Sequence, residues 1–472
     1  MNNPFLAKTI PRRETIIEHT SNLLNEYNNL KGINPGIKNI NWEILKLACL
    51  YHDLGKMNIM FQKKLLGHLK EKDDLDDTIY KTLNIREIPH GFLSPAFLPK
   101  IRLREKYSKD EMRILYQSIY YHHARKKPYN SNDLKTIIKE DLERYIYDFK
   151  YDEIGKIENL YHSYNKYIKR RIPDPNDSSK IYYQYVMTKG LLNKIDYAAS
   201  CGVVIEEKNE DLFDKTQTYF NKMGYNLNEL QKYMIKHQDE NNIIVASTGI
   251  GKTEAALFWI SNNKGFFTLP LKVSINAIYD RVIDNKTIGF NKSKTALLHS
   301  DTMSEYLKRG INKSKNDSIE DFDLEYYDKT KQLSLPLTIC TLDQLIDFIF
   351  KYEGFELKLA TLSYSKLIID EIQMYSPDLI AYLIVALKYI TEIGGKFSIL
   401  TATLPNIFVD FMRNEGINFN IPKKPFLKKN KNGNIQLRHR VNVFEESINI
   451  DHVLENYQNK KVLIIVNTVK KA

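Results

Sequence analysis

One eight-residue segment restricts what this 472-residue chain can fold into more than any other feature. Residues 246–253 read ASTGIGKT, directly after the apolar run NIIV and directly before the helical sequence EAALFWI. A phosphate-binding loop needs glycines that let backbone amides approach the phosphates, a lysine for the β and γ phosphates, and a hydroxyl for Mg²⁺. Strand, loop and helix occur here in that order, so the segment predicts a P-loop. The residues expected to bind ATP and Mg²⁺ are Thr248, Gly249, Gly251, Lys252 and Thr253.

Five further short apolar runs follow the P-loop, and most of them lead into a helical stretch. They read KGFFTLPL, TALLHS, LTICT, KLIIDE and FSILTAT, between residues 264 and 403. Short apolar runs that end in polar residues and alternate with helices are typical of buried parallel strands. We therefore predict a RecA-like P-loop domain with a parallel sheet over residues 211–420.

The runs KLIIDE and FSILTAT carry further residues that a nucleotide site requires. Asp370 and Glu371 end the first run, where one carboxylate binds Mg²⁺ and the next orients the attacking water. Thr401 and Thr403 end the second run, and the amide of Gln373 in the DEIQ sequence can hydrogen-bond across to them. These three residues are the expected coupling residues. Three nucleotide motifs on three strands predict an NTPase with ATP and Mg²⁺ as cofactors.

Residues 1–210 have a different pattern of apolar residues, which predicts an all-α domain. The segments WEILKLACLYHDLGK, DEMRILYQSIYYHHA and YQYVMTKGLLNKIDYAASC each carry apolar residues at helical spacing. Histidines and aspartates recur along this half, and imidazole with carboxylate suits borderline divalent metals such as Mn, Fe, Co, Ni or Zn. The expected metal ligands are His19, His52, Asp53, His90, His122, His123 and Asp196.

The order His, His-Asp, His, His-His, Asp resembles the HD phosphohydrolase superfamily. Its later elements are similar to the nuclease domain of the CRISPR-associated helicase-nucleases of type I systems. The resemblance implies two ions that activate water for attack on phosphorus and stabilise charge on the phosphate oxygens. It places one ion among His19, His52, Asp53 and Asp196, and the other among Asp53, His90, His122 and His123.

Two residues beside these ligands have further implications. The resemblance gives Lys56 a catalytic role beside Asp53, as a contact to a non-bridging phosphate oxygen; the alternative is an exposed helical lysine. His90 is the third element of this order. Relatives usually have a basic residue directly before that histidine, whereas Pro89 precedes His90 here. That departure leaves a phosphate contact at this position open.

The sequences between the nucleotide motifs resemble the strand-tracking motifs of superfamily 2 helicases. They are TLPLKVSINAIYDRV at 268–282 and ICTLDQLIDFIF at 339–350. The resemblance implies contacts to the sugar-phosphate backbone, which carry no sequence information. Gln231, upstream of the P-loop, resembles the adenine-reading glutamine of such helicases. The implied DNA contacts are Asn276, Arg281, Thr341 and Gln344.

The end of the chain resembles the opening of a second RecA-like domain. KKVLIIVNTV at 460–469 predicts one further strand, after the basic, glycine-containing stretch PKKPFLKKNKNGN. A single strand cannot form a sheet domain, so residues 421–472 are expected to be a linker and the incomplete beginning of that domain. The chain is therefore expected to be truncated and to hydrolyse ATP poorly.

Composition narrows the environment and the partners. The net charge of +11 suits a nucleic-acid partner, although the codon bias of an AT-rich genome accounts for it equally well. Three widely spaced cysteines predict neither a disulfide framework nor a zinc knuckle and favour a reducing compartment. No window reaches the ~18 apolar residues of a membrane span. We therefore expect a cytoplasmic protein with no membrane partner.

Both motif series together suggest the N-terminal portion of a type I CRISPR-associated helicase-nuclease. The resemblance implies a metal-dependent DNase that acts on single-stranded DNA and is recruited by an RNA-guided surveillance complex. Two alternatives stay open. One is an HD nucleotide phosphohydrolase with a P-loop ATPase regulatory half, and the other is a catalytically inactive fragment that binds DNA.

Overall fold

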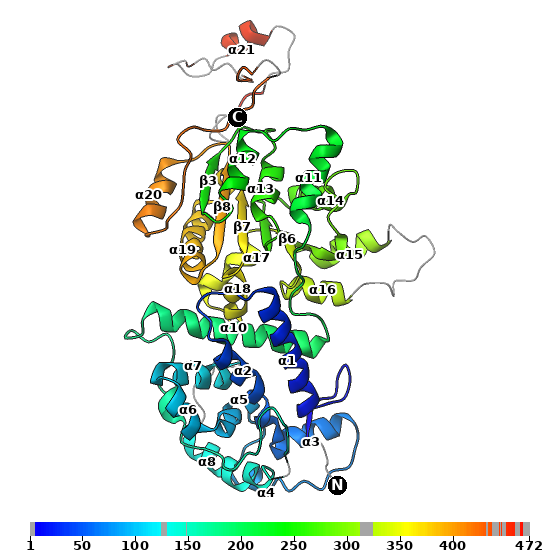
Figure 1. Ribbon diagram of the computed structural model, residues 1–472, viewed down its shortest axis with the longest axis vertical. Coiled ribbons are helices and arrows are strands. Elements are labelled where there is room, and N and C mark those ends of the chain that lie inside the picture. The colour runs from blue at the N-terminus through cyan, green and yellow to red at the C-terminus, as the bar shows by residue number, and fades with distance from the viewer. Residues whose placement is uncertain are drawn as a thin grey trace. The chain divides into compact units, whose positions relative to one another are not determined.

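The computed structural model describes residues 5–123, 130–147, 149–311 and 324–430, and, beyond these, 433–436, 443, 445, 450–457 and 463–465. Met1–Phe426 form one compact unit, and Leu427–Ala472 are a second (Figure 1). In the second unit, α21 spans Ile450–Tyr457. The strand predicted at 460–469 lies largely outside the described residues, and 463–465 have no regular secondary structure.

The described residues up to Cys201 form the predicted helical half, and side-chain caps explain where several helices begin. Thr15 and Glu18 form a capping box at the start of α1, and Ser178 caps α10, which Gly202 ends in the left-handed conformation. A small antiparallel pair, β1 (Leu6–Lys8) with β2 (Glu14–Thr15), was not predicted. The helices are α1 (Ile16–Ile33), α2 (Trp42–Tyr51), α3 (Ile59–His68), α4 (Thr78–Thr82), α5 (His90–Leu93), α6 (Lys100–Lys106), α7 (Lys109–Tyr120), α8 (Ser131–Glu140), α9 (Asn165–Ile168) and α10 (Ser179–Cys201).

One detail of that half differs from the sequence pattern, which predicts a helix through His52 and Asp53. The structure ends α2 at Tyr51, and a 3-10 turn, η1, follows at Leu54–Met57. Ser94 Oγ donates to the carbonyl of His52 and accepts the Gly55 N–H at 2.9 Å. These backbone groups are therefore bonded to a side chain rather than to the next helical turn.

The second half is an α/β domain whose six parallel strands are ordered β3-β8-β7-β4-β6-β5. All six apolar runs predicted as strands form strands. They are β3 (Asn242–Val245), β4 (Gly265–Thr268), β5 (Thr295–Leu298), β6 (Leu337–Cys340), β7 (Lys366–Asp370) and β8 (Lys396–Thr401). The helices are α11 (Leu212–Met223), α12 (Glu229–Lys236), α13 (Lys252–Ile260), α14 (Lys272–Ile283), α15 (Thr302–Ile311), α16 (Leu324–Lys331), α17 (Asp343–Ile346), α18 (Phe355–Leu362), α19 (Pro377–Ile393) and α20 (Asn406–Asn414).

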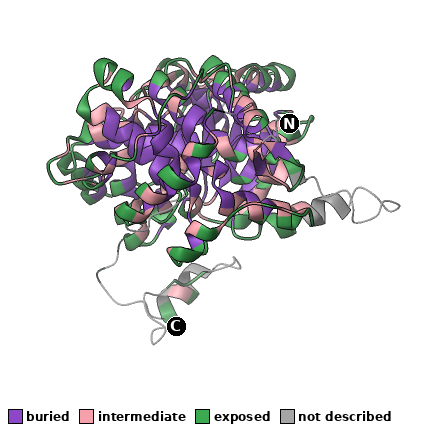
Figure 2. Cartoon of the chain, turned by 90° about the horizontal axis from the view of Figure 1, so that it is seen from below, coloured by how far each residue is buried: buried purple, intermediate pink, exposed green. Residues whose placement is uncertain are grey.

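Two hydrophobic cores stabilise this unit. One lies between the sheet and α11–α14. The other runs without interruption from the helices of the first half to α18, α19 and α20 on the sheet, so the two halves share it. Figure 2 shows buried residues throughout the interior of the unit. No helix among the described residues combines the length and apolarity needed to cross a membrane.

The contact between the halves is centred on α10 and α18. Gly190 is required there, because a Cβ at this position would lie 2.2 Å from the carbonyl oxygen of Glu356. Lys189 forms a buried ion pair with Glu356 at 3.0 Å. Buried lysines from both halves, Lys194 of α10 and Lys264 before β4, bind the carboxylate of Glu206, Lys194 at 2.7 Å. Such a contact couples the folding of the two halves.

Candidate metal centre and nucleotide site

Seven ligand side chains from five places in the helical half converge on one point. They form two groups in which one ligand atom from each residue lies within 4.8 Å of the others. The sources are α1, the end of α2, the start of α5, the residues just after α7, and α10. The first group is His19, His52, Asp53 and Asp196, and the second is His90, His122 and His123.

Asp53 connects the two groups. Its Oδ2 lies 3.4 Å from His19 Nε2, and its Oδ1 lies 3.4 Å from His52 Nε2. The same Oδ1 lies 3.0 Å from His90 Nε2, in the second group. Asp53 is 2% exposed, so the carboxylate is almost entirely surrounded by these groups. This is the position that a ligand shared by two ions would occupy.

The remaining distances complete both groups. His19 Nε2 lies 3.1 Å from Asp196 Oδ1, and His52 Nε2 lies 3.9 Å from the same oxygen. His90 Nε2 and His122 Nε2 are 3.0 Å apart. His123 is the most exposed ligand, with its Nε2 3.8 Å from Asp196 Oδ2.

Backbone hydrogen bonds orient two of the histidines as metal ligands. His52 Nδ1 lies 3.1 Å from the Cys49 carbonyl oxygen, and His122 Nδ1 lies 2.6 Å from that of Ile119. A ring that donates Nδ1–H to a carbonyl presents the Nε2 lone pair, the usual arrangement of a ligating histidine. His52 Nε2 is buried without a hydrogen-bond partner among the described residues. The donor set therefore fits a divalent ion.

The electrostatics also suit ligation. Burial lowers the pKa of His90 to about 4, and burial with three neighbouring imidazoles holds the pKa of His122 well below its usual range. Burial opposes ionisation of Asp53, but His52 and Lys56 outweigh it, and the pKa of Asp53 is well below its usual range. Near neutral pH His90 and His122 are thus neutral and Asp53 is ionised, the forms that bind metal. His52 differs, because burial opposes its protonation but Asp53 and Asp196 outweigh burial and raise the pKa of His52.

Three further residues position the ligands. Glu14 of β2 is 3% exposed and lies 3.3 Å from His19 Nδ1. Ser94 binds the carbonyls of both His52 and His90. A Cβ at Gly55 would lie 2.2 Å from the His90 carbonyl oxygen, so only glycine fits. Gly55 follows the His-Asp pair closely in the sequence, whereas Glu14 and Ser94 belong to no motif.

Lys56 lies inside the site and is not the exposed helical lysine of the alternative. It belongs to the 3-10 turn after Asp53, its side chain is 12% exposed, and its Nζ lies 2.7 Å from Asp53 Oδ2. The expected contact of Lys56 with a phosphate oxygen stays a prediction.

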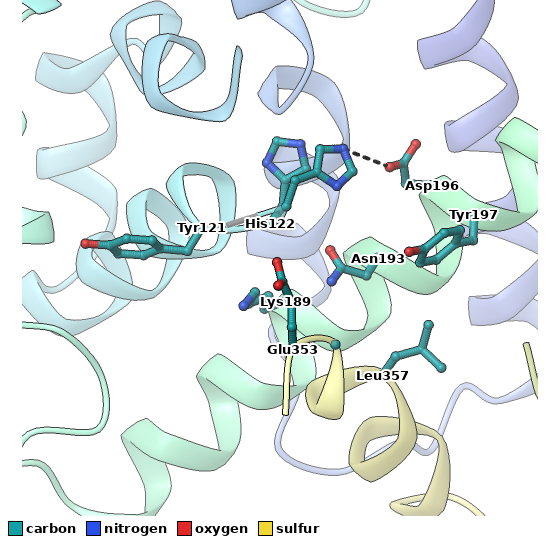
Figure 3. Close-up of a pocket in the computed structure, with 10 residues that line it drawn as sticks. Tyr121, His122, Lys189, Asn193, Asp196, Tyr197, Glu353 and Leu357 are labelled. Atoms are coloured by element: carbon teal, nitrogen blue, oxygen red, sulfur yellow. Dashed lines mark ion pairs between the residues drawn. The ribbon is translucent and has the colours of Figure 1, made fainter. Parts of the chain in front are cut away.

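A cavity of about 170 Å³ opens beside the histidines and is closed on one side by the α/β half (Figure 3). Its lining from the helical half includes three residues of the site, His122, His123 and Asp196. Glu353, from the segment before α18, faces the histidines across the cavity. Any substrate bound in this cavity therefore touches residues of both halves.

The nucleotide motifs meet at the carboxyl ends of the parallel strands, where ligands of open α/β sheets bind. Gly249 and Gly251 have φ values of 72° and 92°, which favour glycine, and α13 begins at Lys252. Lys252 Nζ lies 2.5 Å from Glu371 Oε1 and 3.9 Å from Asp370 Oδ1. Thr248 and Thr253 flank these residues in the same loop and the first turn of α13.

A chain of hydrogen bonds links the carboxylates to β8. Gln373 Nε2 donates to Glu371 Oε2 at 2.5 Å, and Thr401 Oγ1 donates to Gln373 Oε1 at 2.6 Å. Thr403 N–H in turn donates to Thr401 Oγ1 at 3.2 Å. The structure therefore brings the three expected coupling residues together with Glu371.

Burial raises the pKa of Asp370 to about 6, while Lys252 opposes that rise. A buried carboxylate with a raised pKa is stabilised in its ionised form by a cation such as Mg²⁺. Asp370 thus has the environment expected of an Mg²⁺ ligand.

The expected adenine and DNA contacts are more dispersed. Gln231 forms a capping box with Asn228, and its Nε2 donates to the Gly251 carbonyl at 3.4 Å, beside the P-loop. Arg281 forms an ion pair with Glu254 of α13. The other three DNA candidates lie on the segments after β4 and β6. Asn276 Oδ1 is 3.4 Å from His299 Nε2, and Gln344 donates a hydrogen bond to Asp343. The hydroxyl of Thr341 is buried.

The fold and the two sites define the class of protein: an HD-type metal-dependent phosphohydrolase domain fused to a RecA-like P-loop domain. Family models agree, matching residues 29–173 as the Cas3 HD domain and residues 228–410 as a DEAD/DEAH box helicase. Over these two ranges the chain is similar to a Cas3 HD domain followed by a DEAD/DEAH box helicase domain.

Several known proteins are similar to this chain over most of its length. The CRISPR-associated nuclease/helicase Cas3 of Methanothermobacter thermautotrophicus is 26% identical over 91% of this chain, which spans 57% of that relative. A putative counterpart from Methanocaldococcus jannaschii is 24% identical over 89% of the chain, which spans 63% of it. The crystal structure of T. fusca Cas3 with AMPPNP has a TM-score of 0.59 at 16% identity and covers 89% of this chain, which covers 53% of it.

Proposed function

We propose that this chain is a metal-dependent nuclease for single-stranded DNA, joined to one domain of an ATP-dependent DNA motor. The observation that carries the proposal is the convergence of seven ligands on two adjoining groups that share Asp53. A pair of sites bridged by one carboxylate is typical of enzymes that cleave phosphodiesters.

The residues of the site have separate roles in the proposed reaction. Divalent ions held there would activate a water and offset charge on the phosphate oxygens. Asp53 Oδ1 lies beside histidines of both groups. Glu14, the Cys49 carbonyl and the Ile119 carbonyl hold the imidazoles in place. Lys56 keeps a positive charge beside Asp53, where a phosphate oxygen can accept a hydrogen bond.

The first prediction concerns metal and substrate. With Mn²⁺, Fe²⁺, Co²⁺ or Ni²⁺ added, we expect the chain to degrade circular single-stranded DNA, and we expect chelation to abolish cleavage, because imidazole-rich sites favour these ions. Cleavage across the metal panel is measured on gels, and metal content is measured on the same samples.

A small-substrate phosphohydrolase would give the opposite result. If circular DNA survives while deoxynucleoside triphosphates are consumed, the nuclease proposal is wrong. Duplex circular DNA is the matched control, since its paired strands should enter the cavity beside His123 far less readily. Binding without any cleavage, with metal present at the site, would favour the inactive DNA-binding fragment.

The second prediction concerns ATP. The described residues contain one six-stranded sheet, whereas RecA-like motors complete their ATP site with residues of a second domain. We expect the chain to bind ATP through Lys252 and to turn it over about 1000-fold more slowly than a two-domain motor, since a transition-state arginine alone is worth that much. Calorimetry measures binding, and phosphate release measures turnover.

Lys252→Ala should weaken ATP binding about tenfold or more, because it removes the charge that meets the β and γ phosphates. Lys215→Ala on the exposed surface of α11 is the matched control and should change nothing. Equal ATP affinity of the Lys252 variant would contradict the assignment of the P-loop.

We further propose that the activity is exerted with an RNA-guided complex. A structure described as a CRISPR RNA-guided surveillance complex, pre-nicking, is similar to this chain with a TM-score of 0.50. Co-migration of the chain with a purified surveillance complex on target DNA, and its absence without the complex's guide RNA, tests the partner.

A further inference from the structure

One polar side chain on the wall of the metal-site cavity has no partner. Asn193 of α10 is 8% exposed and lines the cavity, yet its amide makes no hydrogen bond with any described residue. The amide reaches the cavity, where a ligand or water can pair with it. Figure 3 shows the amide projecting from α10 into the cavity.

The position of Asn193 on α10 relates it to the metal ligands. Asn193 lies three residues before Asp196, about 4.5 Å along the helix axis, and residues at this spacing share a helix face. Lys189 and Tyr197 line the same cavity from the same face. The face of α10 that presents a metal ligand thus presents Asn193 beside it.

The other charged groups of the cavity explain why an uncharged donor matters there. Lys189 is paired with Glu356 at 3.0 Å, and both side chains are buried. Glu353 and Asp196 are acidic and repel a phosphodiester until cations are bound. Asn193 is the one amide among the described residues that line the cavity, and like the hydroxyls of Tyr121 and Tyr197 it can donate without adding charge.

We propose that Asn193 binds the substrate by donating a hydrogen bond from its side-chain amide to a non-bridging oxygen of the phosphodiester held beside Asp196. This inference rests on the proposed function and deepens it, because it names a substrate-binding residue of the same site. Lys56 lies beside Asp53, and Asn193 lies one helical turn from Asp196, so each of the two aspartates has a hydrogen-bond donor near it.

The test uses two variants of the full chain loaded with Mn²⁺, and two substrates. Asn193→Leu removes the amide at similar volume, and Asn193→Asp keeps the shape but replaces the donor by a carboxylate. Both should lower kcat/KM about 10- to 100-fold, the effect of losing one hydrogen bond to a charged group, and Asp should be the worse. The substrates are bis(4-nitrophenyl) phosphate and single-stranded DNA.

Several controls separate contact with substrate from a structural role. Gln184→Leu makes the same kind of change elsewhere on α10 and should leave kcat/KM unchanged. Melting temperature and bound Mn²⁺ should stay at the level of the unaltered chain in both Asn193 variants. A fall in kcat/KM for single-stranded DNA alone would overturn the phosphate contact. A fall explained by missing metal, or no change in kcat/KM, would overturn it too.

Failure of the nuclease proposal can be told apart from failure of this inference. If the unaltered chain hydrolyses the small diester but not DNA, the nuclease proposal is wrong and the Asn193 comparison is still decided on the diester. If it hydrolyses neither, binding of inorganic phosphate to the Mn²⁺-loaded chain is compared by calorimetry. Equal phosphate affinity in both variants would then overturn the inference.

Discussion

Asp53→Ala is expected to reduce cleavage of single-stranded DNA about 1000-fold or more while leaving DNA binding intact. Asp53 is the carboxylate within 3.4 Å of histidines in both ligand groups, so its loss weakens both metal positions at once. Metal ions stabilise the transition state of phosphoryl transfer by several kcal/mol, and each 1.4 kcal/mol is a factor of ten in rate. Cleavage rates, DNA affinity and bound metal are measured on the same protein.

The matched control is Asp74→Ala, at an exposed aspartate of the same half. It should leave cleavage, metal content and melting temperature unchanged. Lys56 and His52 lose a buried partner in the Asp53 variant, which could therefore be less stable. Circular dichroism tests whether this variant is folded. Cleavage by Asp53→Ala at the rate of the unaltered chain would refute the assignment of the site.

Glu206→Gln is expected to destabilise the folded chain by about 3–5 kcal/mol at neutral pH, the usual effect of removing one partner of a buried ion pair. The variant leaves Lys194 and Lys264 buried without a counter-charge, at the contact between the two halves. Since the halves share one hydrophobic core, both should lose stability together. Denaturant unfolding followed by circular dichroism measures the change.

The pH dependence identifies the cause. Burial lowers the pKa of Lys264 to about 8, although Glu206 opposes this, so the folded state favours the neutral amine more than the unfolded state does. The unfolded chain therefore binds more protons above pH 8, and the contribution of Lys264 to stability rises with pH until it levels off near pH 10. Loss of Glu206 lowers the folded-state pKa of Lys264 further, so the part of the Glu206→Gln defect that comes from Lys264 should shrink as the pH rises toward 8 and level off above it.

Glu207→Gln is the matched control, because the neighbouring Glu207 pairs with Lys329 at 3.0 Å with both side chains partly exposed. A pair of this kind contributes about 1 kcal/mol or less. Equal destabilisation by the two variants, or a Glu206 defect that does not change with pH, would contradict the buried-charge explanation.

The sequence predicts the scaffold well where local patterns determine it. All six strands were visible as short apolar runs, because buried parallel strands are apolar on both faces. The seven candidate metal ligands could be picked out because their order along the chain is specific, and the structure brings them together. Their roles, and the domain boundaries at 210 and 420, stay predictions.

What the sequence could not predict depends on contacts between distant residues. Ser94 fixes the turn at His52 from 42 residues away, and Glu14 reaches His19 from a small strand pair with no sequence signature. Asn193 is an ordinary amide until the fold places it on the cavity wall. Such residues become visible only once the tertiary contacts are known.

The helix α10 has a consequence for dissecting this protein into parts. One face of α10 presents Asp196 to the metal site, and Gly190 and Lys189 pack against α18 of the sheet domain. A polypeptide ended at the boundary between the two functions would keep every proposed metal ligand. It would also expose the surface of α10 that packs against α18, and it would remove Glu356, the ion-pair partner of Lys189. The boundary between the helical half and the α/β half is therefore a poor position at which to truncate the chain.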